Sequence, residues 1–216
     1  MDEVVISKAI VESFTKDFIK ALSVDVAIAG AGPSGLICAY YLAKKGIKVA
    51  VFERHLRVGG GMPGGGMMFN RIVVQQEAIS ILKEFQVNAA KYKNHLYVAD
   101  ALETISTICS KTIKQGVKIF NLINVEDIMV RNQRIVGLVL NWSVVSSSKL
   151  HVDPLGVKAK VVVDATGHES EVCRIVERKM GPKLRTKTGT VIGEKSMWAE
   201  AGEKQIIGNT KEVYPG

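Results

Sequence analysis

The sequence predicts an α/β fold in which a parallel central sheet, with an antiparallel β insert, is organised around a Rossmann-like dinucleotide-binding unit. Three observations predict it: an apolar run at 24–29 ends in a glycine-rich turn, a helical pattern follows at 33–45, and a second apolar run occupies 47–52. Strand, helix and strand within about 30 residues are typical of a right-handed βαβ unit with parallel strands. We expect a single dinucleotide-binding domain over residues 1–216, with its βαβ cradle at 24–53.

A helix is predicted at residues 3–22, before the βαβ unit. Ile10, Phe14, Phe18 and Leu22 recur every four residues and would form one apolar stripe. We expect this stripe to pack on the body of the protein, and a contact with another copy of the chain is the alternative.

The turn after the first strand reads Gly30-Ala31-Gly32-Pro33-Ser34-Gly35 and opens a helix, which is the context that a dinucleotide-binding motif requires. Gly30 permits the tight turn, Gly32 lets the backbone approach a pyrophosphate, and Gly35 lets helix and strand pack closely. The helix N-terminus, with Ser34, offers free N–H groups to phosphate. Glu53, which ends the second strand, would accept hydrogen bonds from the adenosine ribose.

Further elements are predicted along the rest of the chain. The glycine-rich stretch 59–66 is expected to be a loop without regular structure. Helices are expected at 76–86 and 100–115, antiparallel strands at 117–142 with a turn near Asn132, a buried strand at 160–164 and a short helix at 171–179.

Composition limits the classes of function. Charged residues make up 23% of the chain and the formal net charge is +8, but the basic residues are scattered and do not alternate with aromatic ones. This pattern favours a solvated basic surface over a nucleic-acid interface. The three cysteines lie far apart, no apolar run reaches ~18 residues, and the acidic N-terminus does not resemble a signal peptide. We therefore expect a cytoplasmic protein without nucleic-acid or membrane partners.

The cradle by itself does not distinguish FAD from NAD. Glu53-Arg54 followed by a Gly-Gly pair, and a late strand ending in Ala165-Thr166-Gly167, resemble flavoproteins of the two-dinucleotide-binding type. These features taken alone favour an FAD-dependent oxidoreductase.

A second group of polar residues suggests a metal site. His151 and Asp153 would share a face if their segment is strand-like, and His168 follows the carboxyl end of a predicted parallel strand. An Asp and a His with open coordination positions suit a divalent transition metal such as iron(II). The alternative is that Asp153 only starts a turn before Pro154.

The cradle, Glu53-Arg54, the glycine-rich loop, His151-Val152-Asp153-Pro154, Ala165-Thr166-Gly167-His168 and the stretch 193–198 together closely resemble the thiamine thiazole synthase family. The resemblance covers essentially the whole chain. It implies an enzyme of thiamine biosynthesis that binds NAD as a substrate, releases nicotinamide, and combines the ADP-ribose part with glycine and sulfur. The product would be an ADP-thiazole carboxylate, and iron(II) would take part.

The resemblance also implies residue roles. Ser34, Glu53, Arg54, Gly61 and Val125 would contact NAD, although Val125 read alone favours a core strand residue. Asp153 and His168 would ligate iron from different protomers of an octamer, and the segment His151, Val152 and Asp153 would contact NAD held mainly by a neighbouring protomer. His151, Asp153 and His168 are the expected catalytic residues, and His168 could also transfer protons.

Residue 151 indicates the source of the sulfur. In the eukaryotic branch of the family, a cysteine two residues before the metal Asp gives up its own sulfur, whereas His151 stands at that position here. The sequence therefore resembles the archaeal branch, which uses free sulfide and turns over repeatedly.

The resemblance leaves other interpretations open. The family continues beyond the position of Gly216 with a strand, a glycine-rich turn and a helix that carries a glycine-binding arginine, and this C-terminal segment is expected to be missing.

An FAD-dependent oxidoreductase similar to geranylgeranyl reductases is the main alternative, followed by a non-catalytic nucleotide-binding protein.

Overall fold

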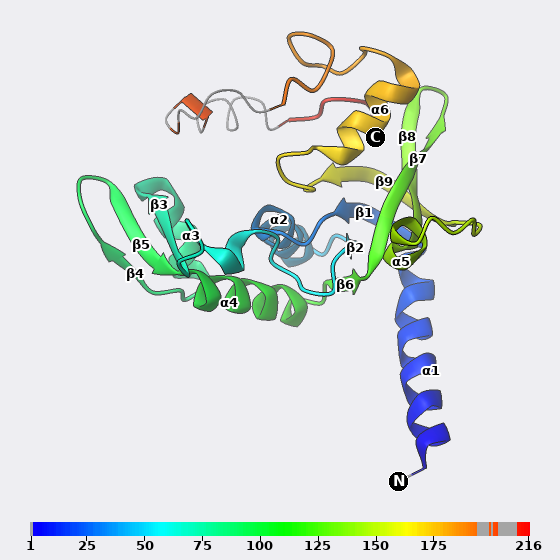
Figure 1. Ribbon diagram of the computed structural model, residues 1–216, viewed down its shortest axis with the longest axis horizontal. Helices are drawn as coiled ribbons and strands as arrows, with labels where there is room; N and C mark the ends of the chain where they lie inside the picture. Colours follow the sequence, from blue (N-terminus) through cyan, green and yellow to red (C-terminus); the bar gives the residue numbers. More distant parts are fainter. Residues whose placement is uncertain (1, 194–198, 200, 203–210) are drawn as a thin grey trace.

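The computed structural model describes residues 2–193, 199, 201–202 and 211–216 (Figure 1). Most of the predicted motif at 193–198 lies outside the described residues. In chain order the helices and strands are α1 (Glu3–Ala21), β1 (Ser23–Ala29), α2 (Pro33–Lys44), β2 (Val49–Glu53), η1 (Met62–Gly64), β3 (Arg71–Gln75), η2 (Gln76–Ala78), α3 (Ile79–Glu84), β4 (Ala89–Lys91), β5 (Leu96–Asp100), α4 (Ala101–Lys114), β6 (Lys118–Asn121), β7 (Ile123–Arg131), β8 (Arg134–Trp142), α5 (Ser143–Ser147), β9 (Leu155–Asp164) and α6 (Glu171–Met180).

A six-stranded sheet with the order β6-β2-β1-β9-β8-β7 forms the centre of the molecule. The four strands β6, β2, β1 and β9 are parallel to one another, and β8 and β7 continue the sheet in antiparallel pairing. The predicted fold class, an α/β fold with a parallel central sheet and an antiparallel part, is confirmed.

The central strands are buried on both faces because their apolar residues alternate between two cores. On β2, Ala50 and Phe52 join one core with Phe120, whereas Val49 and Val51 join the other. Helices α2, α3 and α4 cover the second face, and α6 with the C-terminal end of α1 covers the first. Two covered faces fix the positions of the strands and therefore of the loops at their carboxyl ends.

The antiparallel prediction for 117–142 is partly correct. Strands β7 and β8 form a hairpin around Asn132 and Gln133, which both have positive φ as a two-residue turn requires. The prediction is wrong for β6, which pairs parallel to β2 because the chain returns to the sheet through helix α4. The glycine-rich stretch is a loop except for one short 3₁₀ turn, η1.

A second, three-stranded antiparallel sheet, β3-β5-β4, was not predicted. It lies beyond α4, away from the central sheet (Figure 1). The run Arg71–Gln75 is rich in β-branched residues, a signal that favours a strand. Within the described part of the chain, no helix is long and apolar enough to cross a membrane.

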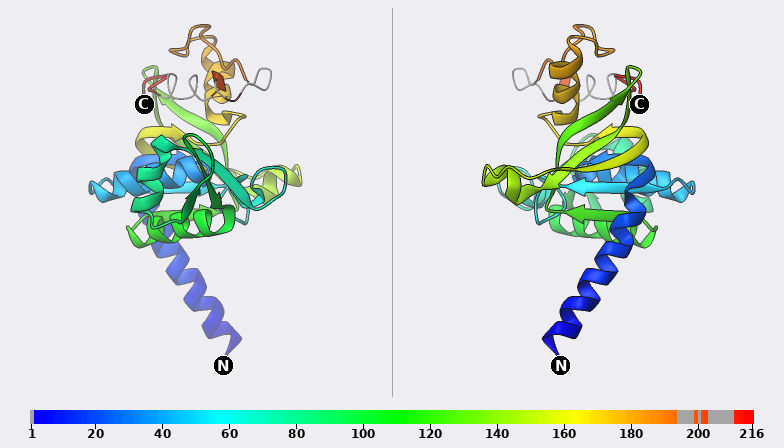
Figure 2. Two further views of the ribbon diagram at one scale, coloured as in Figure 1. Left: turned by 90° about the vertical axis from the view of Figure 1, so that its left-hand side faces the viewer. Right: turned by 90° about the vertical axis from the view of Figure 1, so that its right-hand side faces the viewer.

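Helix α1 packs on the body through its C-terminal part alone. Phe14 and Phe18 contact Phe120 with ring centroids 5.8 and 5.1 Å apart, and Phe14 also lies beside Trp142. The N-terminal half projects away from the sheet, as Figure 2 shows, and the side chain of Ile10 is 64% exposed. The expectation that the whole stripe packs on the body is therefore wrong for its first half, because the described residues offer no surface beyond the aromatic cluster.

Candidate functional site

The carboxyl ends of β1, β2 and β9 meet at one edge of the sheet, and the predicted cradle lies there. Gly30 N–H donates to the carbonyl of Phe52 at 2.8 Å, and Ala165 N–H donates to the carbonyl of Ala29 at 2.9 Å. These bonds join the glycine turn to the neighbouring strand ends on both sides. Ligands of parallel sheets gather at this edge.

Two glycines of the turn are required by packing. A Cβ on Gly30 would lie 2.4 Å from the carbonyl oxygen of Ala165, and Gly30 has a φ of +99°. A Cβ on Gly35 would lie 2.1 Å from the carbonyl oxygen of Gly30. Both positions therefore exclude any side chain, because the atoms in the way belong to the backbone.

Gly32 differs from these two glycines. Among the described residues, no atom beyond its chain neighbours lies within 4 Å of a Cβ built on Gly32. Gly32 is the N-cap of α2, Pro33 follows at the first helical position, and the side chain of Ser34 is exposed. An open space thus lies in front of the helix N-terminus, where N–H groups and the helix dipole favour a phosphate.

The glycine-rich loop adds a wall beside this space. Gly59 N–H donates to the carbonyl of Ala31 at 2.8 Å. Gly60 lies so close to Gly32 that a Cβ on it would be 3.3 Å from the Gly32 Cα. Gly61, predicted to contact NAD, follows at the exposed start of η1.

Glu53 is buried at the end of β2, with only 4% of its surface exposed. One carboxylate oxygen accepts the N–H of Ala31 at 2.8 Å, and the other accepts the N–H of His55 at 2.8 Å. The side chain therefore fixes the glycine turn against β2. The oxygen that accepts the His55 N–H also lies 3.0 Å from the His55 Nδ1, whereas the oxygen that accepts the Ala31 N–H keeps a second lone-pair site that can accept a hydroxyl.

Arg54 reaches across the sheet edge to α6. Its guanidinium forms an ion pair with Glu171 in the first turn of that helix. Its carbonyl accepts the hydroxyl of Ser143 at 2.5 Å. Val125, the other residue predicted to contact NAD, lies half-buried on β7 and packs against a core cluster.

His151, Val152 and Asp153 lie in an exposed segment between α5 and β9. The expectation of a strand-like segment is wrong: β9 begins only at Leu155, because Pro154 has no N–H to donate to a ladder. The segment is tied to β8 by Asn141, whose buried amide donates to the Val152 carbonyl at 3.1 Å. Sequence reasoning missed Asn141, which no motif marks.

His168 lies in an exposed position in the loop after β9. Asp153 precedes the first residue of this strand and His168 follows its last. The strand has 10 residues, so its ends are roughly 30 Å apart at the usual rise per residue. Asp153 and His168 of one chain are therefore too far apart to bind one metal ion. Among the described residues, no group of three or more possible metal ligands occurs within one chain.

The three cysteines are free and half-buried. Burial raises the pKa of the Cys38 and Cys109 thiols above the ordinary value. Burial, together with the nearby Asp164 carboxylate, raises the pKa of Cys173 to about 12. All three thiols are therefore held in the protonated, weakly nucleophilic form.

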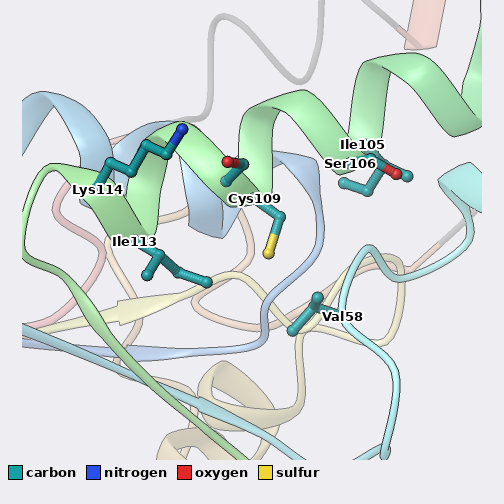
Figure 3. Close-up of a pocket in the computed structure, with 7 residues that line it drawn as sticks. Val58, Ile105, Ser106, Cys109, Ile113 and Lys114 are labelled. Carbon is teal, nitrogen blue, oxygen red and sulfur yellow. The ribbon is translucent and has the colours of Figure 1, made fainter.

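An open cavity of about 470 Å³ lies along α4 and is lined by Val58, Ile105, Ser106, Cys109, Ser110, Ile113 and Lys114. Figure 3 shows the sulfur of Cys109 and the side chain of Ile113 directed to the side of α4 on which Val58 lies, with the Lys114 ammonium directed away. None of the predicted site residues lines this cavity.

Comparison with known proteins finds relatives along the whole chain. The sequence profile described as "Thi4 family" matches residues 7–216. The "thiamine thiazole synthase" of Methanothermobacter thermautotrophicus is 54% identical over 215 residues, which cover 100% of this chain and 83% of that relative. The crystal structure of Thermovibrio ammonificans THI4 has a TM-score of 0.95 at 49% identity and covers 100% of this chain and 83% of that chain.

A more distant solved structure shares the fold alone. L-proline dehydrogenase from P. horikoshii has a TM-score of 0.55 at 15% identity and covers 78% of this chain and 63% of that chain. At this identity the likeness supports the flavoprotein-type dinucleotide-binding fold without indicating a shared activity.

Proposed function

The chain belongs to the Thi4 family, the family of thiamine thiazole biosynthesis, and from this premise we propose a specific reaction for it. The enzyme makes an ADP-thiazole carboxylate from NAD, glycine and free sulfide, uses iron(II), and releases nicotinamide. NAD is consumed as a substrate, so the cradle holds a reactant whose adenylate half leaves in the product.

The open space at Gly32 is the observation that carries the proposal. A nucleotide pyrophosphate fits there because the turn presents backbone N–H groups without a side chain in front of them. The buried Glu53 carboxylate lies at the adjoining strand end, where it can accept a ribose hydroxyl. Binding the ADP part in this way leaves the nicotinamide half to react.

The residues proposed for iron have suitable chemistry. A carboxylate from Asp153 and an imidazole from His168 form a donor set that suits iron(II) and leaves coordination positions open. Iron(II), when bound, supplies a Lewis acid that can hold sulfide and polarise a substrate oxygen. His168 has a second role in the proposal, taking and returning protons at its imidazole during enolisation and dehydration.

The separation of the two donors supports a shared site. Because a strand of 10 residues separates Asp153 from His168, one iron ion can use both only if a second protomer supplies one of them. The exposed segment 151–153 is then free to reach NAD held by a neighbour. A homo-oligomer, an octamer as in the family, is therefore part of the proposal.

The state of the cysteines supports free sulfide as the sulfur source. His151 stands where the sulfur-donating branch has cysteine, and an imidazole has no sulfur to give. Each of the three cysteines has a raised pKa, which disfavours the reactive thiolate. Repeated turnover with added sulfide follows.

Substitution of the proposed ligands tests the reaction. We expect Asp153→Ala and His168→Ala in the full-length protein to abolish formation of an adenylated thiazole under anaerobic conditions with NAD, glycine, sulfide and iron(II). Lys158→Ala, on the exposed side of β9, is the matched control and should keep normal activity. Normal turnover in either ligand variant would refute the ligand assignment. A stoichiometric yellow flavin band in the purified protein would instead favour an FAD-dependent oxidoreductase.

A further inference from the structure

The N-terminus of helix α6 is capped in an unusual way. Its N-cap residue, Ser170, has a left-handed backbone with φ 47° and ψ 51°, and its side chain makes no capping hydrogen bond. Serine at this position normally accepts the N–H of the second or third helical residue. In this helix, two N–H groups of the first turn, those of Glu171 and Cys173, donate to other side chains.

The last residue of β9 and the loop after it supply the acceptors. The hydroxyl of Thr166 accepts the N–H of Glu171 at 2.8 Å, and a carboxylate oxygen of Asp164 accepts the N–H of Cys173 at 2.9 Å. Thr166 is itself held by Asp164, whose other oxygen accepts the Thr166 hydroxyl at 2.6 Å and the Thr166 N–H at 3.1 Å. The last residue of the strand thus binds the start of the helix both directly and through Thr166.

This network closes the loop that carries His168. The loop is further closed by a hydrogen bond of 3.1 Å from the N–H of Ser170 to the carbonyl of Gly167. Gly167 and Ser170, which flank His168 and Glu169, both have positive φ. A left-handed backbone at Ser170 is unfavourable by itself, so contacts elsewhere must maintain it.

We propose that Asp164 and Thr166 are positioning residues that set the direction of the His168 side chain by capping α6 from the end of β9. The inference rests on the proposed function, in which His168 ligates iron and moves protons. Residues that orient a metal ligand without touching the metal commonly affect metal affinity strongly. Neither side chain needs to contact substrate or metal for this role.

The test uses Thr166→Val, which keeps the shape of the side chain and removes its hydroxyl, and Thr166→Ser, which restores the hydroxyl. Asp164→Asn tests the second acceptor. Asp100→Asn is the matched control, because Asp100 caps α4 by accepting the N–H groups of Leu102 and Glu103. All variants are made in the full-length protein and titrated with cobalt(II), followed by visible absorption, and separately with NAD.

We expect Thr166→Val and Asp164→Asn to weaken cobalt(II) binding by about tenfold or more, with a changed absorption band, while Thr166→Ser and Asp100→Asn stay within about twofold of the wild type. NAD affinity should be unchanged, and hydrogen exchange of the 165–180 peptide should accelerate in Thr166→Val. Unchanged cobalt(II) binding in Thr166→Val and Asp164→Asn would overturn the inference, as would a parallel loss of cobalt(II) and NAD binding. If His168→Ala binds cobalt(II) like the wild type, the ligand assignment itself is wrong and the inference is overturned with it.

Discussion

Gly30 and Gly32 lie two residues apart in one turn, yet a methyl group on each meets different surroundings. Gly32→Ala places its Cβ in open space, so we expect an unchanged free energy of unfolding and NAD affinity at least about tenfold weaker. Gly30→Ala collides with the Ala165 carbonyl at positive φ and should lower the free energy of unfolding by at least about 2 kcal/mol. Urea unfolding and calorimetric NAD titration check both variants. Equal NAD affinity in wild type and Gly32→Ala would place the pyrophosphate elsewhere.

Cys173 should make the stability of the protein sensitive to alkaline pH. The thiol ionises near its ordinary pKa of 9.0 in the unfolded chain, whereas burial and the Asp164 carboxylate raise the pKa of the folded thiol to about 12. A raised pKa means that the stabilisation is complete below pH 9 and is lost as the pH rises towards 12. We therefore expect wild type to lose stability faster than Cys173→Ala between pH 9 and pH 11 in urea unfolding. Parallel pH profiles for the two proteins would contradict this assignment.

At the scale of elements, helix α1 has two halves that should respond differently to substitution. Phe18 packs on Phe120, so Phe18→Ala should lower the free energy of unfolding by about 2–3 kcal/mol. Ile10 is 64% exposed, so Ile10→Ala should change the free energy of unfolding by less than about 0.5 kcal/mol. Urea unfolding of the full-length protein measures both changes. A cost for Ile10→Ala as large as that for Phe18→Ala would show that the assembled protein covers the first half of the helix.

The predictable elements are those whose local pattern agrees with their packing. The strand at 24–29, the helix at 33–45 and the strand at 47–52 carry buried runs and turn glycines, and the structure places them at β1, α2 and β2. The direction of β6 could not be read from its four residues, because pairing with β2 depends on the path of the chain through α4. The segment at 151–153 alternates like a strand, but Pro154 prevents a ladder there.

The part of the candidate site that lies within the βαβ unit was predictable from the sequence, whereas the contacts outside that unit were not. The glycine turn and Glu53 belong to one continuous βαβ unit, so their meeting follows from the sequence. The roles of Asn141 and Asp164 depend on hydrogen bonds between neighbouring segments, 11 and 9 residues apart in sequence, and no local motif indicates them. Periodicity indicates which residues are buried but not which side chains cap a neighbouring helix or hold a loop.

At the scale of the whole molecule, a site shared between protomers predicts complementation. Asp153→Ala and His168→Ala are each expected to be inactive, but oligomers assembled from both variants would contain some sites with both ligands intact. Random assembly from equal amounts should restore up to about a quarter of wild-type activity. Co-expression of two differently tagged variants, with purification through both tags, provides the mixed oligomer. No recovery of activity would indicate that both residues serve the same protomer.

The central claim is that the cradle holds an NAD molecule that is consumed in a sulfide-dependent reaction. Its most direct test is the amount of adenylated thiazole formed per chain, measured by mass spectrometry after anaerobic incubation of the full-length protein with NAD, glycine, iron(II) and sulfide. The expected result is several equivalents of product per chain with sulfide and none without it, accompanied by equal release of nicotinamide. Absence of product, or a single equivalent that does not depend on sulfide, would contradict the claim.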